Sequence, residues 1–244
     1  MTLLLALSAA FAGTCTEIDA GDVLSVPPPA VIVLGERPGV GRDDRRATRI
    51  ARQLRNIAPV TVALETAPQA LQPVLDRYES GDIATEHLEE ELDWELETGL
   101  PYGPYSGLLT GAVDDLNVVA VGSRSWHPPS TIDVPVSPAY LDVLRDTMGA
   151  GEMPRAAESD FLQFVAWRDH ELARRSLASW DGRGYLVILT HRNRIEGGFG
   201  VPWQLGGQTE ATVASFVLGW GEEPPCYDGD RVWKETFLEK LFGG

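Results

Sequence analysis

The stretch Val31-Ile-Val-Leu-Gly-Glu-Arg-Pro-Gly-Val-Gly41 decides the fold of this chain. It begins with an apolar run that shows no polar alternation, which is typical of a strand covered on both faces in a parallel sheet. A loop with three glycines follows. Across Arg42–Ala58, apolar residues then fall on one side of a helical wheel and arginines on the other. Strand, loop and amphipathic helix in this order predict the first β-α unit of an α/β domain.

The same pattern recurs along the chain. Strands are predicted at Ala30–Leu34, Val60–Leu64, Val118–Val121, Tyr185–Leu189 and Thr212–Leu218. Further helices are predicted at Pro68–Glu79, Thr85–Trp94, Tyr105–Asp114, Pro138–Met148 and Glu158–Trp180. Repeated strand–helix units predict an α/β fold, with a mostly parallel central sheet flanked by helices in a single domain. Residues 124–136, which contain three prolines, are expected to form a long surface loop or a lid.

The charge of the chain limits its partners. The formal net charge is −16 over 244 residues. Nucleic acid is therefore excluded as a partner, because phosphate binding needs a basic field on the protein. Adhesion of the folded domain to anionic lipid is excluded for the same reason.

The N-terminal segment resembles an export signal. Residues 3–12 are apolar, too few to span a bilayer but suited to the core of a signal peptide. Ala12-Gly13-Thr14-Cys15 resembles a lipobox, in which the cysteine becomes lipidated. We therefore expect an exported lipoprotein, periplasmic or at the outer membrane, anchored only through Cys15. The alternatives are a wrongly assigned start and a helix packed on the domain.

These observations divide the chain into three parts. Residues 1–15 are predicted to be the leader, residues 16–29, with Pro27-Pro28-Pro29, an extended linker, and residues 30–244 the folded domain. The sequence has only two cysteines, Cys15 and Cys226, so no disulfide framework is expected.

Candidate ligand-binding residues follow the predicted strands. In open α/β sheets, ligands bind beyond the carboxyl ends of the strands. Glu36, Glu65 and His191 stand at such ends, and we expect them to share one hollow. Asp169 lies within the core-facing stripe of the long helix, where a carboxylate is costly unless it is paired. It is expected either to form a structural ion pair or cap, or to support the strand-end site, with Arg168 as partner in both cases.

The glycine loop after the first strand does not indicate a nucleotide site. It contains neither Gly-x-x-x-x-Gly-Lys-Ser/Thr nor Gly-x-Gly-x-x-Gly, the two specific phosphate-binding patterns. Glu36 and the later Asp43-Asp44 would also repel phosphate. No nucleotide cofactor is therefore expected.

The order of motifs across residues 30–240 resembles the ChaN family, the haem-binding uptake group within the Tiki and erythromycin-esterase superfamily. The matching pieces are Val31-Ile-Val-Leu-Gly-Glu36, Val62-Ala-Leu-Glu65, Gln72-Pro-Val-Leu-Asp-Arg-Tyr78, Ser80-Gly-Asp-Ile83, Trp94, Tyr102-Gly-Pro104, Val118-Val-Ala-Val121, Arg168-Asp169, Leu186-Val-Ile-Leu189, Gly198-Phe-Gly-Val-Pro202 and Val232-Trp233. The resemblance implies an α/β domain that binds haem or a metal at the strand ends.

Relatives in the superfamily use two Gly-x-x-His motifs and a glutamate to bind metal or to catalyse hydrolysis. In this chain Pro38 stands in the first histidine position and Arg194 in the second, while His191 replaces the second glycine. Neither proline nor arginine can ligate a metal. The resemblance therefore implies a degenerate site. Its surviving ligand-binding candidates are Glu36, Glu65, Arg168 and Asp169, with His191 as a substitute ligand.

Three functions remain open from the sequence. The first is a haem or porphyrin carrier, with Tyr102 or His191 as the iron ligand; the alternative for Tyr102 is simple packing at a helix start. The second is a non-catalytic scaffold whose strand-end cleft is filled by Arg37, Arg194 and Trp203. The third is a hydrolase acting through Glu36 and His191, although the missing histidines favour a protein that is not an enzyme. A homodimer around the ligand also stays open.

Overall fold

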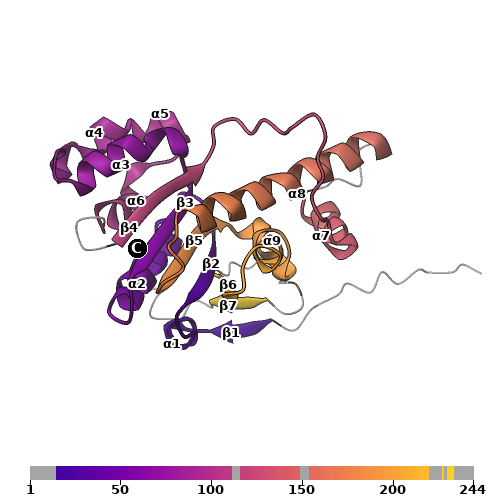
Figure 1. Ribbon diagram of the computed structural model, residues 1–244, viewed down its shortest axis with the longest axis horizontal. Coiled ribbons are helices and arrows are strands. Elements are labelled where there is room, and N and C mark those ends of the chain that lie inside the picture. Colours follow the sequence, from indigo (N-terminus) through magenta and orange to yellow (C-terminus); the bar gives the residue numbers. More distant parts are fainter. Residues whose placement is uncertain (1–14, 112–115, 149–153, 220–226, 228–229, 234–244) are drawn as a thin grey trace, which may run out of the picture.

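The computed structural model describes residues 15–111, 116–148, 154–219, 227 and 230–233. Within these residues, seven strands form one sheet in the order β1-β7-β6-β2-β5-β3-β4, and every described pairing is parallel (Figure 1). The strands are β1 (Thr16–Ile18), β2 (Ala30–Glu36), β3 (Val60–Pro68), β4 (Leu116–Gly122), β5 (Tyr185–His191), β6 (Thr212–Val217) and β7 (Arg231–Trp233). The predicted α/β class is confirmed.

Strand β2 occupies the middle of the sheet and carries the opening stretch of the sequence. All seven of its residues are buried, as expected for a strand with neighbours on both edges and helices on both faces. It pairs with β5 from Ala30 opposite Tyr185 to Glu36 opposite His191, and with β6 on its other edge. This register brings Glu36 and His191 to the same end of adjacent strands.

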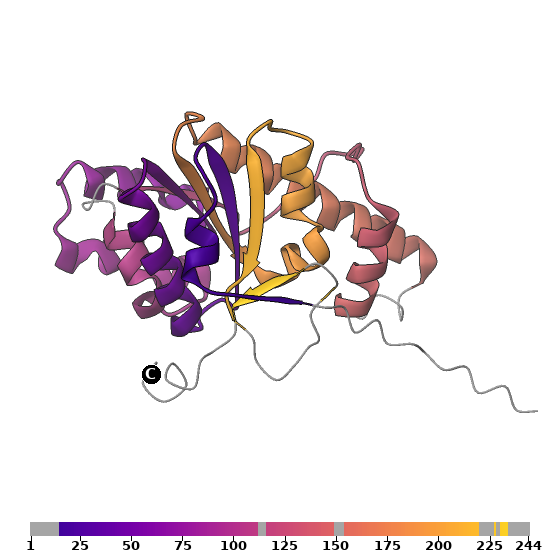
Figure 2. The ribbon, with the colours of Figure 1, turned by 90° about the horizontal axis from the view of Figure 1, so that it is seen from below.

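Helices cover both faces of the sheet (Figure 2). One face packs on α1 (Ala20–Leu24), α2 (Gly41–Arg55), α3 (Gln72–Glu79), α4 (Leu88–Leu92), α5 (Trp94–Thr98) and α6 (Tyr102–Leu109). The other packs on α8 (Arg155–Ala178) and α9 (Val201–Gly206). Helix α7 (Pro138–Met148) packs on α8 through a separate small core around Tyr140. We call the two faces the α2 side and the α8 side.

Three predicted helices differ clearly from the observed ones. The helix predicted at Pro68–Glu79 begins only at Gln72, because β3 extends to Pro68 and a single 3-10 turn follows it. The helix predicted at Thr85–Trp94 is divided, because Asp93 has a left-handed backbone (φ 45°) that ends α4 before α5 begins at Trp94. The helix predicted at Tyr105–Asp114 begins earlier, at Tyr102, directly after Pro101. It ends at Leu109, and residues 112–115 lie outside the described part of the chain. Local turn geometry, rather than apolar periodicity, set the boundaries of these last two helices.

The linker prediction for residues 16–29 is wrong in its first half. Strand β1 joins the edge of the sheet by pairing with β7, and Ile18 and Val23 bury their side chains in the α2-side core. Asp19 caps α1 by accepting hydrogen bonds from the amides of Gly21 and Asp22. The folded domain therefore begins about fifteen residues before the boundary predicted from the proline triplet.

Cys15, just before β1, is disulfide-bonded. Cys226, the only other cysteine of the sequence, lies outside the described residues. A sulfur atom in a disulfide cannot also carry a thioether-linked lipid. Lipidation of Cys15 therefore stays a prediction that is incompatible with this disulfide. Within the described ranges, no helix has the length and apolarity needed to cross a membrane.

The segment between β4 and α7 forms the predicted long loop, which passes over α8 (Figure 1). Trp126 anchors the loop: its ring lies edge-on to Trp167 of α8, with centroids 6.0 Å apart. The Arg175 guanidinium lies 4.6 Å from the centre of the same indole. The alternative role of this loop as a lid stays a prediction.

Candidate functional site

Charged side chains gather at the carboxyl ends of the central strands, but on two different faces of the sheet. Leu34 belongs to the α2-side core, so Glu36, two residues later in the same strand, extends towards that side. Ile188 belongs to the α8-side core, and Thr190 follows it to that side. Glu65 accepts a hydrogen bond from Thr190. The single hollow predicted for Glu36 and Glu65 is therefore divided into two clusters, one on each side of the sheet, although the charge of Glu65 still helps to raise the pKa of Glu36.

Arg194 is the centre of the α8-side cluster. Its Nη1 donates to Asp169 Oδ1 at 2.6 Å, and its Nε forms an ion pair with Glu65 Oε1 at 2.7 Å. Asp169 is fully buried and Arg194 is only 6% exposed. A buried guanidinium held by two carboxylates satisfies charges that would otherwise be very unfavourable inside the protein. The structure thus gives Asp169 an ion-pair partner, but that partner is Arg194 rather than the predicted Arg168.

Neutral groups complete this cluster. The Tyr140 hydroxyl, from α7, donates to Asp169 Oδ2. Thr190 Oγ1 and the His191 amide both donate to Glu65 Oε2, the latter at 3.1 Å. Both carboxylates are therefore satisfied by chain atoms on more than one side, and the cluster joins β3, α7, α8, β5 and the turn at residues 192–194.

Two glycines let the turn that carries Arg194 approach the sheet. A Cβ atom on Gly35 would lie 2.5 Å from Ile195 Cδ1 and 3.0 Å from the Arg192 Cα atom. Gly200 has a left-handed backbone (φ 64°), and a Cβ there would lie 2.2 Å from the Arg194 carbonyl oxygen. Gly35, the first glycine of the opening stretch, thus allows close packing of the 192–195 turn on β2. Its role is packing and not phosphate binding.

Burial and neighbouring charges shift the pKa values of the ionisable side chains in this cluster. Burial acts to raise the pKa of Glu65, but Arg194 and the hydrogen bonds from Thr190 and His191 outweigh it, so this pKa lies below its usual value. Burial raises the pKa of Asp169 despite the opposing effect of Arg194. Burial lowers the pKa of His191, which favours a neutral imidazole.

The α2-side cluster is a pair of buried carboxyl groups. Glu36 and Asp44, in the first turn of α2, are both fully buried. Glu36 Oε1 accepts from the Tyr105 hydroxyl at 3.3 Å, whereas Glu36 Oε2 and both Asp44 oxygens find no other donor among the described residues. Two carboxyl groups satisfy each other when one of them holds a proton. Burial and the mutual interaction raise the pKa of Glu36 well above its usual value, and burial raises that of Asp44 to about 6.

Asp43, next to this pair, is bound by Arg37. It accepts from the Arg37 amide at 3.0 Å, from Nε at 2.9 Å and from Nη2 at 2.8 Å. Arg37 thereby fixes the loop between β2 and α2. Pro38 lies in this same loop.

The donor set does not fit a metal ion. Within the described part of the chain, no three histidine, cysteine, aspartate or glutamate side chains gather closely enough to hold one. On the α8 side, the Arg194 guanidinium lies between the two carboxylates that a cation would need. On the α2 side, the two carboxyl groups face each other without an imidazole. We therefore derive no chemistry through a metal at the strand ends.

The remaining predicted residues take different places. Arg168 lies beside the α8-side cluster, 5.9 Å from the centre of the Phe164 ring, and forms no ion pair within the described ranges. Tyr102 begins α6 on the α2 side, half-buried, with its ring 6.3 Å from that of Trp94. Burial raises the Tyr102 pKa to about 12. Tyr102 and His191 thus belong to different surroundings.

Asp44, Tyr105 and Tyr140 were missed as site residues. Asp44 was counted only among the charges that would repel phosphate, although it stands in the first turn of the helix that follows the buried strand β2. Tyr105 and Tyr140 carry no such signal, since most tyrosines in helices fill cores.

The comparisons show a match to one family model over part of the chain and a likeness in fold over most of it. Residues 26–125 match the model of the haem-binding uptake family, Tiki superfamily, ChaN. The structure resembles that of ChaN of Campylobacter jejuni, described as showing cofacial haem binding, with a TM-score of 0.66 and 17% identity over 87% of this chain and 89% of that one. No curated protein matches the chain.

Two toxin domains share the fold more distantly. The C-terminal region of the Pasteurella multocida toxin, described as having a thiol-protease-like catalytic triad, aligns with a TM-score of 0.52 and 11% identity over 91% of this chain. The RRSP effector domain of a Vibrio vulnificus MARTX toxin aligns with a TM-score of 0.50 and 15% identity over 88% of this chain. The alignments cover 28% and 39% of the two toxin chains. At these identities the likeness concerns fold alone. The chain therefore resembles the ChaN family of haem-binding uptake proteins, in sequence over residues 26–125 and in fold over most of its length.

Proposed function

We propose that this protein binds haem or a related porphyrin on its α2 side, and that it binds no metal at the strand ends. The family match over residues 26–125 carries the proposal, because that segment holds β2, α2 and α6 but neither α8 nor Arg194. Tyr102 lies in the matched segment. It is the candidate iron ligand, since a tyrosine oxygen is an established axial ligand of haem iron.

The state of Tyr102 gives this proposal a pH dependence. The phenol is protonated at neutral pH, and burial raises its pKa to about 12, with Tyr78 and Glu89 adding to the effect. Ligation by the phenolate releases this proton. Haem binding through Tyr102 should therefore strengthen as the pH rises from 6 towards 9, by up to about tenfold per pH unit where one proton is released.

Hemin titration followed by absorption spectroscopy tests the proposal. The wild type should give a Soret band that saturates with hemin, and Tyr102→Phe should shift or abolish it. Tyr140→Phe, on the α8 side, is the matched control and should bind as the wild type does. Absence of saturable binding in the wild type, or equal spectra for the wild type and Tyr102→Phe, would count against ligation by Tyr102.

A non-catalytic scaffold is the second candidate function. It is favoured by Arg194, which fills the space between Glu65 and Asp169 as the scaffold hypothesis expects. Arg37 is engaged with Asp43, whereas Trp203 is 37% exposed and does not fill the strand ends. The same titration separates the two candidates, since a scaffold gives no saturable Soret band.

The hydrolase hypothesis receives less support. Within the described residues Glu36 forms no hydrogen bond with the His191 ring, and its partners are Tyr105 and Asp44. The charges that act on His191 come from Glu65, Arg194 and Arg168 rather than from Glu36. A general base and its orienting carboxylate need to be within hydrogen-bond reach.

Export to an oxidising compartment forms part of the proposal. It is supported by the apolar residues 3–12 and by the disulfide of Cys15, since disulfides persist mainly outside the cytosol. A lipid on Cys15 is not part of it.

A further inference from the structure

Arg168, on α8, is a half-buried cation without a partner in the described part of the chain. Its Nε atom is shielded from solvent and has no acceptor, and its guanidinium forms no hydrogen bond or ion pair with a described residue. Burial and the like charge of Arg194 lower its pKa. A guanidinium that has partly left water without gaining an acceptor is costly, and an anion from outside would offset that cost.

The carboxylates near Arg168 are engaged by other donors. The charges of Asp169 and Glu65 both act on Arg168. Asp169, however, accepts from Arg194 at 2.6 Å through one oxygen and from a tyrosine hydroxyl of α7 through the other. Glu65 pairs with Arg194 at 2.7 Å, and its second oxygen accepts from two donors at the end of β5. All four carboxylate oxygens therefore have donors other than Arg168.

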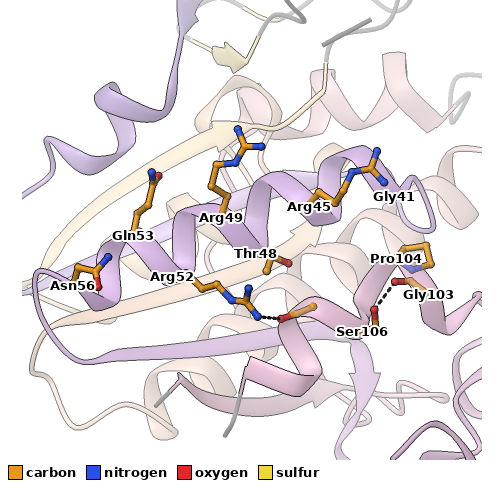
Figure 3. Close-up of a pocket in the computed structure, with 11 residues that line it drawn as sticks. Gly41, Arg45, Thr48, Arg49, Arg52, Gln53, Asn56, Gly103, Pro104 and Ser106 are labelled. Atoms are coloured by element: carbon orange, nitrogen blue, oxygen red, sulfur yellow. Dashed lines mark hydrogen bonds between the residues drawn. The ribbon is translucent and has the colours of Figure 1, made fainter. Parts of the chain in front are cut away.

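Other arginines of the protein show what a satisfied guanidinium looks like here. Between α2 and α6, Arg52 is exposed and donates to the Gly107 carbonyl at 3.5 Å (Figure 3). On α8, Arg175 is half-buried and donates to the Glu171 carboxylate at 3.0 Å and to two carbonyl oxygens at the end of β4. Arg168 is as buried as Arg175 by class but lacks such acceptors among the described residues.

An aromatic surface adjoins the Arg168 guanidinium. The guanidinium lies 5.9 Å from the centre of the Phe164 ring, and this ring lies 6.0 Å from that of Trp167. Trp126, in the long loop, meets Trp167 edge-on, also at 6.0 Å. All three aromatic side chains are half-buried, so each keeps a part that solvent can reach. We call Arg168, Phe164, Trp167 and Trp126 together the Arg168 surface.

The Arg168 surface offers one free positive charge. Arg194 is neutralised by its two carboxylates, and burial lowers the pKa of His191, which favours an uncharged imidazole. A guanidinium can hold a carboxylate through two parallel hydrogen bonds. Half-buried aromatic rings offer packing to another aromatic ring. The ligand that matches this surface therefore has one carboxylate and an aromatic body.

We propose that the Arg168 surface binds an aromatic monocarboxylate, with the acid group on Arg168 and the ring on Phe164 and Trp167. This surface lies on the α8 side of the sheet, whereas Tyr102, the candidate haem ligand, lies on the α2 side. The inference goes beyond haem binding and does not depend on it.

Calorimetric titration of the full chain with 2-naphthoate tests this proposal. The ligand controls are 2-naphthalenemethanol, which keeps the ring without the charge, and acetate, which keeps the charge without the ring. 2-Naphthoate should bind at least about tenfold more tightly than each control, because each control lacks one of the two contacts. This comparison uses the wild type alone, so it does not depend on the folding of a variant. Binding of 2-naphthoate that is no tighter than that of one of the controls overturns the proposal.

Arg168→Gln should weaken 2-naphthoate binding about tenfold or more, with the fold checked by circular dichroism. Arg174→Gln changes an exposed arginine of the same helix and is the matched control, which should bind as the wild type does. Tyr102→Phe should also bind 2-naphthoate as the wild type does, which separates this surface from the proposed haem site. The proposal is overturned if Arg168→Gln binds as the wild type does, or if either of the other variants weakens binding as much as Arg168→Gln.

Discussion

Arg194 and Asp169 lie 2.6 Å apart in the interior of the protein, beside the carboxyl ends of the central strands. The guanidinium supplies, in permanent form, the positive charge that the buried carboxylates Glu65 and Asp169 require. Arg194 therefore holds a fixed cation of the chain between the two carboxylates. This relationship leads to the first prediction.

Arg194→Leu should reduce the free energy of unfolding by about 3–5 kcal/mol, because it leaves two buried carboxylates without a cation. Urea denaturation at pH 7 measures the change. The triple variant Arg194→Leu, Glu65→Gln, Asp169→Asn removes the unpaired charges and should recover a large part of the loss. A triple variant as unstable as the single one would show that Arg194 acts through packing and not through charge.

Asp44→Asn should stabilise the protein at neutral pH. The pKa of Asp44 is raised from 3.8 to about 6, so between these values the native state binds more protons than the unfolded state, and stability falls as pH rises through this window. The variant cannot lose a proton, and its amide can donate to Glu36. We expect a gain of about 2 kcal/mol at pH 7 and a flatter stability curve between pH 4 and 6.

Asp43→Asn is the control for that experiment. It weakens the contacts with Arg37 and should destabilise the protein while keeping the dependence on pH. If Asp44→Asn were less stable than the wild type at pH 7, the two carboxyl groups would not be sharing a proton.

Gly35→Ala should destabilise the protein by about 1–3 kcal/mol, the usual range for overpacking, because the new methyl group would lie 2.5 Å from Ile195 Cδ1. Ile195→Val removes that Cδ1 atom, and in the double variant part of the loss should be recovered. Thermal unfolding of the three proteins measures this coupling. Losses that simply add in the double variant would contradict the proposed contact.

The disulfide of Cys15 predicts the chemical state of this residue in the purified protein. Protein purified from an oxidising compartment and denatured without reductant should show no reactive thiol, and its Cys15 peptide should carry no lipid by mass spectrometry. Cys15→Ser should lower the free energy of unfolding by about 2–4 kcal/mol. A lipid found on Cys15 would contradict the structure at this residue.

The elements that were predicted correctly are those that have a clear hydrophobic pattern in the sequence. All five predicted strands are present, because short apolar runs between amphipathic helices have few other solutions. Strand β1 was missed because its three residues show no apolar pattern and gain their place only by pairing with β7. The break at Asp93 was missed because a left-handed aspartate within a helical pattern has no periodic signal.

Part of the candidate site was also predicted, because the ends of the strands can be located in the sequence. The rule that ligand-binding groups follow parallel strands located Glu36, Glu65 and His191 at one edge of the sheet. The rule did not say on which face of the sheet each side chain lies. Side chains alternate between the faces along a strand, so the face of the last residue depends on where the strand ends. The pairing of Asp169 with Arg194 joins residues 25 positions apart across two elements, and it follows from tertiary packing that no local pattern records.

The position of haem iron in a crystal of the full chain grown with hemin tests the central claim most directly. An anomalous difference map at the iron edge locates the iron independently of the fitted protein. Our account predicts a peak within ligand distance of the Tyr102 hydroxyl, on the α2 side of the sheet. A peak between Glu65 and Asp169, with Arg194 displaced, would contradict it.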